Sequence, residues 1–288
     1  MSVSWAHSPP GLLREHHARD AAALAGDLPG DVSEAGLSVE TPFQGGILFT
    51  PQEPTGEAIV VYFHGGGFLA GSPVTHRAVT AWLAHATGLR ILSARYRLTP
   101  EDPYPAQQDD ALAAIRHAVG MAGPAGVILA GDSAGACVAL WGYHGLPAAE
   151  RSAVRGLVLF YGGFGLVESD SITRYGSVEN GLNREALANM YAQLAPPPAP
   201  APPWPHEFAS TVTAPVLIVA AGLDAVLDDS LRLARTLGPH PRHRLDVAQQ
   251  QDHGFLKRAG TGEAVAKLID GAANWMRECV GQEFTPGA

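Results

Sequence analysis

A serine lies between two glycines in the segment Gly131-Asp132-Ser133-Ala134-Gly135. The apolar run GVILA, which is typical of a strand, comes directly before it, and a helical pattern follows it. A serine at such a strand-to-helix turn has its hydroxyl lifted above the sheet, and glycine is needed where a side chain would collide with neighbouring elements. The pattern therefore indicates a nucleophilic Ser133 more strongly than a glycine-rich turn that carries a serine by chance.

A second glycine-rich segment, HGGGF at residues 64–68, directly follows the apolar run of residues 58–63. Three consecutive glycines leave main-chain N–H groups uncovered by side chains. Such donors can stabilise an oxygen on which negative charge develops during a reaction. The segment is thus a candidate oxyanion-binding loop, and it suits the same chemistry as an activated serine.

The spacing of Gly65, Gly67 and Ala70 also fits a loose dinucleotide-binding fingerprint. This alternative is weaker for two reasons. The next strand does not end in an acidic residue that would bind a ribose, and Gly-Ser-Pro at residues 71–73 interrupts the helix that should begin here. The one version of this alternative that remains is an NADP-binding site in which Arg95 binds the 2′-phosphate.

A serine nucleophile needs a base, and the base needs an acid that orients it. Among 12 histidines, His253 stands out because it follows the last strand pattern and precedes the final helix, with Gly254 freeing the loop. Asp224 follows the apolar run of residues 215–221. Both residues are therefore expected at the carboxyl ends of strands, where open α/β sheets place their sites.

Three other carboxylates are near competitors of Asp224 for the role of the acid. Asp228 and Asp229 are adjacent in sequence, and capping of a helix over residues 230–237 explains them equally well. Asp252, next to the candidate base, is expected to be solvated.

The elements that must position these residues alternate along the chain. Strands are predicted at residues 58–63, 90–94, 126–130, 156–161, 215–221 and 243–248, and amphipathic helices at residues 76–88, 109–120 and 263–280. Most of the strands are continuous apolar runs, which is typical of parallel strands covered on both faces. The alternation predicts an α/β fold with a mostly parallel sheet flanked by helices. Residues 37–39 and 47–49 are expected to form an antiparallel pair ahead of it.

Two segments do not fit the alternation. Residues 1–36 have a helical pattern ahead of any predicted strand, and residues 165–205 are inserted between two core strands. The insertion holds a predicted helix at residues 183–194 and a proline-rich stretch at residues 196–205. We interpret that stretch as a stiff return linker, with a PxxP ligand for a partner domain as the alternative.

Composition excludes several classes of protein. The chain has 288 residues and a formal net charge of −9, with no block of basic residues that a nucleic-acid or anionic-membrane surface would need. No apolar run is long enough to span a bilayer, the start has no secretory-signal pattern, and two cysteines, Cys137 and Cys279, make no disulfide framework. We expect a cytoplasmic protein that is a monomer or homodimer, with no metal site.

The motifs together resemble those of the bacterial hormone-sensitive-lipase-like group of α/β-hydrolase esterases. HGGGF, YRLTPEDPYPAQQDDALAAI at residues 96–115, GDSAG, DAVLDDS and HGF occur in that family's order and cover most of residues 58–256. The order serine, aspartate, histidine is also that of α/β-hydrolases. Two departures are Ala225 in place of the family's usual proline and GACVA in place of the commoner GGNLA after the serine. Neither changes a catalytic atom, so they bear on substrate preference.

The resemblance implies an α/β-hydrolase fold and the catalytic triad Ser133, Asp224 and His253. It also implies an oxyanion hole made by the main-chain N–H groups of Gly66, Gly67 and Ala134. Such an enzyme hydrolyses short- to medium-chain carboxylic esters through an acyl-enzyme and needs no cofactor. An amide, carbamate or lactone hydrolase with the same triad is the first alternative, and a non-catalytic small-molecule receptor is the second.

The resemblance further implies that the two odd segments form a helical cap. Residues 1–36 would be its first part and residues 165–205 its inserted part, while residues 37–164 and 206–288 form the core. Both segments need something to cover, and the crevice above the strand ends is the available surface. We expect Phe68, Met190 and Tyr191 to line a pocket for a small-molecule ester there.

Overall fold

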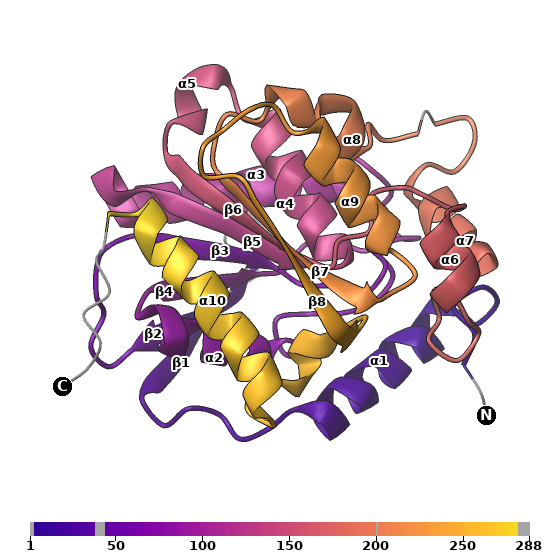
Figure 1. Cartoon of the computed structure of the whole chain (residues 1–288), viewed down its shortest axis with the longest axis horizontal. Helices are drawn as coiled ribbons and strands as arrows, with labels where there is room; N and C mark the ends of the chain where they lie inside the picture. Colours follow the sequence, from indigo (N-terminus) through magenta and orange to yellow (C-terminus); the bar gives the residue numbers. More distant parts are fainter. Residues whose placement is uncertain (1–2, 38–43, 200, 282–288) are drawn as a thin grey trace.

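The computed structural model describes residues 3–37, 44–199 and 201–281 and is built around one eight-stranded sheet (Figure 1). The spatial order of the strands is β1-β2-β4-β3-β5-β6-β7-β8. The strands are β1 Val32–Leu37, β2 Gly46–Pro51, β3 Ile59–Phe63, β4 Arg90–Ala94, β5 Val127–Asp132, β6 Val154–Phe160, β7 Val216–Leu223 and β8 Arg244–Asp252. From β4 to β8 every pair is parallel, whereas β1 and β2 add an antiparallel edge. The predicted α/β fold with a mostly parallel sheet is confirmed.

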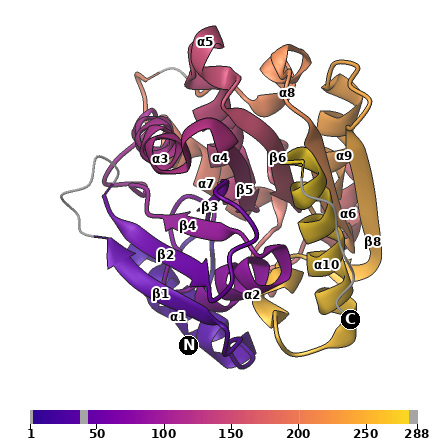
Figure 2. The ribbon, with the colours of Figure 1, turned by 90° about the vertical axis from the view of Figure 1, so that its left-hand side faces the viewer.

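Helices cover both faces of this sheet (Figure 2). The larger ones are α2 Arg77–Thr87, α3 Ala106–Ala122, α4 Ala134–Gly145, α9 Leu227–Thr236 and α10 Glu263–Cys279. In β3, Ile59, Val61 and Phe63 belong to the core under α3, α4 and α9. The alternate residues Val60 and Tyr62 belong to the core under α2 and α10. Because both faces are buried, the strands read as continuous apolar runs.

The edges of the sheet differ from the prediction. The predicted strand at residues 37–39 lies mostly outside the described residues, and β1 instead occupies Val32–Leu37, so the last part of residues 1–36 belongs to the sheet. β8 runs four residues beyond the predicted end, to Asp252. Both strands are polar edge strands, VSEAGL and RLDVAQQQD, whose partly exposed side chains give no apolar run to detect.

Three further helices lie beyond the carboxyl ends of β7 and β8 (Figure 1). They are α1 Pro10–Leu24, α6 Asp170–Tyr175 and α7 Arg184–Leu194. The remaining helical elements are α5 Ala148–Arg151, α8 Pro205–Phe208, η1 Gly123–Ala125, η2 Ala209–Thr211 and η3 Phe255–Arg258. Within the described ranges, no helix combines the length and apolar character that crossing a membrane requires.

The N-terminal segment and the insertion contact each other directly. Asn189 of α7 donates a hydrogen bond from Nδ2 to the carbonyl oxygen of Trp5, at 3.0 Å. The indole of Trp5 lies against the main chain of Gly181, where an added Cβ would stand only 2.2 Å from an indole carbon. Glycine is therefore required there for the two segments to meet.

Candidate active site

Ser133 occupies a sharp turn between β5 and α4 with φ 52° and ψ −121°, a left-handed conformation that is strained for a non-glycine residue. A Cβ on Gly131 would stand 2.4 Å from the carbonyl oxygen of Gly135, and a Cβ on Gly135 would stand 2.0 Å from that of Phe63. Neither contact is sterically possible. The two glycines thus allow α4 to pack closely on β3 and β5 while the serine projects from the turn.

Ser133, His253 and Asp224 form one chain of hydrogen bonds. His253 Nε2 lies 2.9 Å from Ser133 Oγ, and His253 Nδ1 lies 2.8 Å from Asp224 Oδ2. Asp224 is almost fully buried, and its other oxygen accepts a hydrogen bond from the N–H of Val226 at 3.0 Å. A carboxylate that accepts a hydrogen bond from Nδ1–H keeps the proton on that nitrogen and leaves the Nε2 lone pair facing the serine hydroxyl, so the imidazole is oriented as a base.

The turn after β8 directs His253 inward and Asp252 outward. Gly254 adopts φ 77°, which reverses the chain directly after the histidine. The ring of Tyr161 stands edge-on to the imidazole at a centroid distance of 5.0 Å and supports it. Asp252 is exposed, as predicted, and pairs with Arg258 at 2.7 Å.

Asp228 and Asp229 lie in the first turn of α9 but do not cap it. The helix begins at Leu227, and neither carboxylate accepts a hydrogen bond from its own first turn among the bonds between described residues. Asp228 accepts from the N–H of Ser171 at 2.9 Å, and Asp229 accepts from that of Phe164 at 2.6 Å. The capping interpretation is therefore wrong, because these side chains hold the inserted segment instead.

The loop of residues 64–68 lies opposite the serine. Gly66 and Gly67 have φ 126° and φ 60°, and both line the same pocket as Ser133 and Ala134. In the described part of the chain, the N–H groups of Gly66, Gly67 and Ala134 make no hydrogen bond to another protein group. Three main-chain donors are thus available beside the serine hydroxyl.

A buried carboxylate that the sequence reasoning did not single out anchors this loop. Asp132 Oδ1 accepts hydrogen bonds from the N–H of Gly65 at 2.8 Å and from the hydroxyl of Tyr62 at 2.7 Å. His76 Nε2 lies 3.3 Å from the same oxygen. Burial alone would raise the pKa of Asp132, but His76 and these two donors hold it well below its usual range. Its position at the end of an apolar strand was the available signal, because a charge there must be paired.

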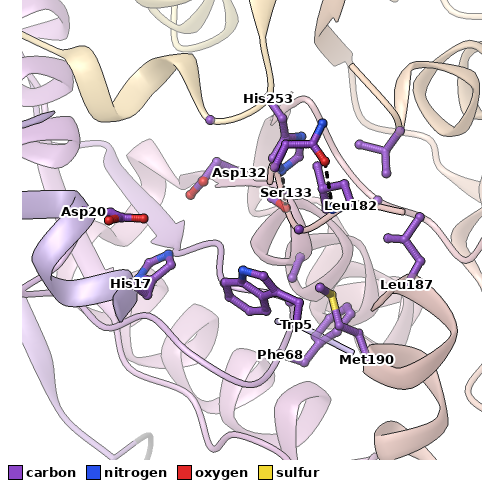
Figure 3. A pocket seen from close by; sticks show the side chains of 18 of the residues that line it. Trp5, His17, Asp20, Phe68, Asp132, Ser133, Leu182, Leu187, Met190 and His253 are labelled. Carbon is purple, nitrogen blue, oxygen red and sulfur yellow. Dashed lines mark hydrogen bonds between the residues drawn. The ribbon is translucent and has the colours of Figure 1, made fainter. Parts of the chain in front are cut away.

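Ser133 lines a cavity of about 140 Å³ that has an apolar and a polar side (Figure 3). The apolar side is lined by Phe68, Leu182, Leu187, Met190, Tyr191 and Val226. The three residues predicted for a pocket, Phe68, Met190 and Tyr191, are among them. The polar side is lined by His16, His17, Asp20 and Lys257. In the view of Figure 3, Trp5 lies between His17 and Asp20 on one side and Met190 and Leu187 on the other.

The sequence reasoning missed Trp5 and the whole polar side. Nothing in the sequence relates α1 to η3, the two elements that carry the polar side, or Trp5 to the insertion that it contacts, because these contacts depend on the tertiary fold. A helical pattern before the sheet indicated only that some surface had to be covered.

The glycine-rich loop of residues 64–68 lacks the geometry of a dinucleotide-binding site. No helix begins at the glycines of residues 65–67, since α2 starts only at Arg77, so a phosphate would find no helix N-terminus there. Among the described residues, no group of three or more His, Cys, Asp or Glu side chains is arranged to hold a metal ion.

A mostly parallel sheet that carries a serine at a strand-to-helix turn, with an acid and a base after later strands, defines the α/β-hydrolase architecture. Residues 60–257 match the family model described as alpha/beta hydrolase fold. The chain belongs to this family, and the resemblance seen in its motifs is confirmed at that level.

Relatives and solved structures agree with the assignment. An acetyl esterase of Salmonella schwarzengrund is 34% identical over 205 residues, which are 67% of this chain and 63% of that protein. The aligned part thus spans less than two thirds of the relative's own length. An esterase structure from Pyrobaculum calidifontis superposes with a TM-score of 0.80 at 24% identity, covering 96% of this chain and 95% of that one. An esterase of the bacterial hormone-sensitive lipase family gives 0.82 at 23% identity, covering 96% and 93%.

Proposed function

We propose that this protein is a serine carboxylesterase. The observation that carries the proposal is the chain of hydrogen bonds from Asp224 through His253 to Ser133. This chain ends in a cavity that the main-chain N–H donors of the glycine-rich loop also line. Ser133 is the nucleophile, His253 the base and Asp224 the acid that orients it. Retention of all three is expected of an enzyme, whereas a small-molecule receptor has no need of them.

The proposed reaction has two stages. Ser133 Oγ attacks the ester carbonyl while its proton passes to His253 Nε2, and the N–H groups of Gly66, Gly67 and Ala134 bind the oxyanion. The tetrahedral intermediate collapses, and the alcohol leaves with the proton from His253. Water then gives a proton to His253 and attacks the acyl-enzyme, which releases the acid and restores Ser133.

The proposed substrates are esters of short- to medium-chain acids. A cavity of about 140 Å³ with an apolar side suits a small acyl group, and the relatives named acetyl esterase support the same range. Phe68, Met190 and Tyr191 would contact the acyl chain. The N-terminal segment up to the end of α1, together with residues 165–205, would form the cap that excludes water, since side chains of both segments line the cavity.

An ester panel tests this function. We expect the protein to hydrolyse p-nitrophenyl acetate and butanoate, with activity falling for long chains, and Ser133→Ala to lose about 10⁴–10⁶ in kcat. Comparison with the matching acetanilide separates esterase from amidase activity. The proposal fails if the folded protein hydrolyses no ester of the panel, or if Ser133→Ala retains the rate.

A further inference from the structure

The polar side of the cavity is built from two elements that lie far apart in the sequence. His17 and Asp20 come from α1, Lys257 comes from η3, and α1 packs against η3. All three side chains line the cavity that contains Ser133. Figure 3 shows His17 and Asp20 on the side of Ser133 that faces Asp132, away from Leu182 and Leu187. None of these groups has a part in the hydrolytic steps described above.

Lys257 is a cation that pairs with no anion among the described residues. The chain has only two lysines, and Lys267 is exposed and paired with Glu263. In the part of the chain that the structure describes, the ammonium of the half-buried Lys257 makes no hydrogen bond or ion pair. Its stem crosses Gly254, where an added Cβ would stand 3.8 Å from Cδ and Cε. Burial lowers the pKa of Lys257, and Asp132 and Asp20 oppose this shift. A hydrogen-bond acceptor on a ligand would therefore stabilise the partly buried ammonium of Lys257.

His17 is a second polar group of this side, and its Nδ1 lacks a partner among the described residues. Its side chain is 3% exposed, and within the described residues Nδ1 makes no hydrogen bond. Its ring stacks on His76 at a centroid distance of 5.7 Å and stands edge-on to Trp5 at 6.3 Å, so its orientation is fixed. Burial, then the charge of Lys257, lowers the pKa of His17 well below its usual value. The ring is therefore a neutral imidazole, which donates at one nitrogen and accepts at the other.

The charges on this side favour a neutral ligand with hydroxyl groups. Asp20 pairs with His16 at 3.1 Å and is about half exposed, so its carboxylate has further acceptor capacity. A carboxylate ligand would be attracted by Lys257 but repelled by Asp20 and Asp132, and a cationic ligand would meet the reverse, so neither charge is favoured by all three groups. A hydroxyl group both donates and accepts, so a ligand with two or more hydroxyls satisfies Lys257, His17 and Asp20 together.

The polar side also lies where the alcohol part of an ester has to bind. His253 gives its proton to the leaving alcohol, so the alcohol oxygen must stand next to Nε2. Lys257 follows His253 by four residues, its stem runs over Gly254, the residue next to the base, and all three residues line the same cavity. Building on the proposed esterase function, we propose that Lys257, His17 and Asp20 bind the hydroxyl groups of the alcohol, and that the preferred substrates are short-chain acyl esters of small polyols or sugars.

Two esters of the same acid test the proposal. In 2-methylbutyl acetate, a methyl group replaces each free hydroxyl of 1-acetylglycerol, so the two esters match in size. We expect the wild-type protein to prefer 1-acetylglycerol, and Lys257→Met to lower the ratio of the two kcat/KM values about tenfold or more, because a hydrogen bond to a charged group is lost. Asp20→Asn is expected to lower the ratio as well, and Lys267→Met, which removes the other lysine, to leave it unchanged.

Three kinetic outcomes would overturn the proposal. They are a wild-type preference for 2-methylbutyl acetate, a Lys257→Met variant that loses both activities in parallel, and a preference for the anionic ester O-acetylglycolate over 1-acetylglycerol. Titration calorimetry with 1-acetylglycerol measures its affinity for the Ser133→Ala variant and for the Ser133→Ala/Lys257→Met double variant, in which no catalysis occurs. If the wild-type protein hydrolyses neither ester, the esterase function fails. Loss of binding in the Lys257→Met protein would then still support the polar site, and unchanged binding would refute it.

Discussion

Asp224 differs from the neighbouring carboxylates in what its two oxygens contact. One oxygen lies 2.8 Å from His253 Nδ1 and the other accepts from the N–H of Val226. Asp228 contacts the inserted segment, and Asp252 contacts Arg258 at the surface. Only the first arrangement holds the imidazole in the orientation that general-base catalysis needs.

We therefore expect Asp224→Asn to lower kcat by about 10⁴, the loss seen when the orienting acid of a serine protease is replaced in this way. Asp228→Asn and Asp252→Asn are the matched controls and are expected to keep kcat near the wild-type value. Steady-state rates on p-nitrophenyl acetate, with circular dichroism to verify folding, make the comparison. A large loss of kcat in either control would show that the acid has been assigned to the wrong residue.

Motif residues and isolated residues differ in how far the sequence predicts them. Ser133 and its flanking glycines were found because local steric constraints force those residue types at that spacing. Lys257 and Trp5 were not found, because a single lysine or tryptophan has no local constraint that reveals its role. Lys257 reaches the cavity where η3 meets α1, and Trp5 reaches it where the N-terminal segment meets α7 and Gly181.

At the scale of elements, α9 holds the start of the insertion through a buried carboxylate. Asp229 Oδ1 accepts hydrogen bonds from the N–H groups of Phe164 and Leu166, whereas Oδ2 has no partner among the described residues. Burial raises the pKa of Asp229 from 3.8 to about 7, although the two N–H donors oppose this. The carboxyl group is thus neutral in the folded protein over a range in which it is ionised in the unfolded chain.

This shift predicts a pH dependence of stability. Because the folded state retains the proton, the contribution of Asp229 is complete below pH 3.8 and is lost as the pH rises to about 7. The loss is a few kcal/mol, since each unit of pKa shift corresponds to about 1.4 kcal/mol. Asp229→Asn cannot ionise, so the free energy of unfolding of this variant should fall less between pH 4 and pH 8. Urea unfolding of both proteins across this range measures the difference, and equal slopes would contradict the shift.

The helix bounds show why that link was not predicted. The sequence indicated a helix at residues 230–237 with acidic residues ahead of it, for which capping is the usual explanation. The helix instead begins at Leu227, which places both acidic residues inside the first turn and directs them toward the insertion. An acidic residue that caps a helix and one that makes a tertiary contact look the same in the sequence, so only the structure distinguishes the two roles.

At the scale of the whole molecule, the central sheet was predictable and the arrangement above it was not. Strands β3 to β7 are apolar because helices cover both faces, and that burial is visible in the sequence. The N-terminal segment and the insertion are held together by Asn189, Gly181 and Trp5. Those contacts join residues more than 170 positions apart and leave no periodic pattern.

Trp5 tests whether the two segments shape the cavity together. Trp5→Ala removes the indole that lies between the polar and the apolar side of the cavity and so enlarges the cavity. We therefore expect the optimum acyl chain length to shift toward longer p-nitrophenyl esters. Trp82→Ala is the control, because its indole donates to the carbonyl oxygen of Asp27 and lies outside this cavity. Both variants should lower Tm modestly. An equal loss of kcat/KM at every chain length in Trp5→Ala would contradict the idea.

The proposed esterase function requires Ser133 to be a nucleophile that His253 activates. The most direct measurement is mass spectrometry after treatment with a fluorophosphonate, which reacts with activated serines. We expect one adduct that maps to the peptide containing Ser133, no adduct in Ser133→Ala, and greatly slowed labelling in His253→Ala because the base is gone. Labelling at another serine such as Ser72 or Ser93, or equally fast labelling of Ser133 in His253→Ala, would contradict the account.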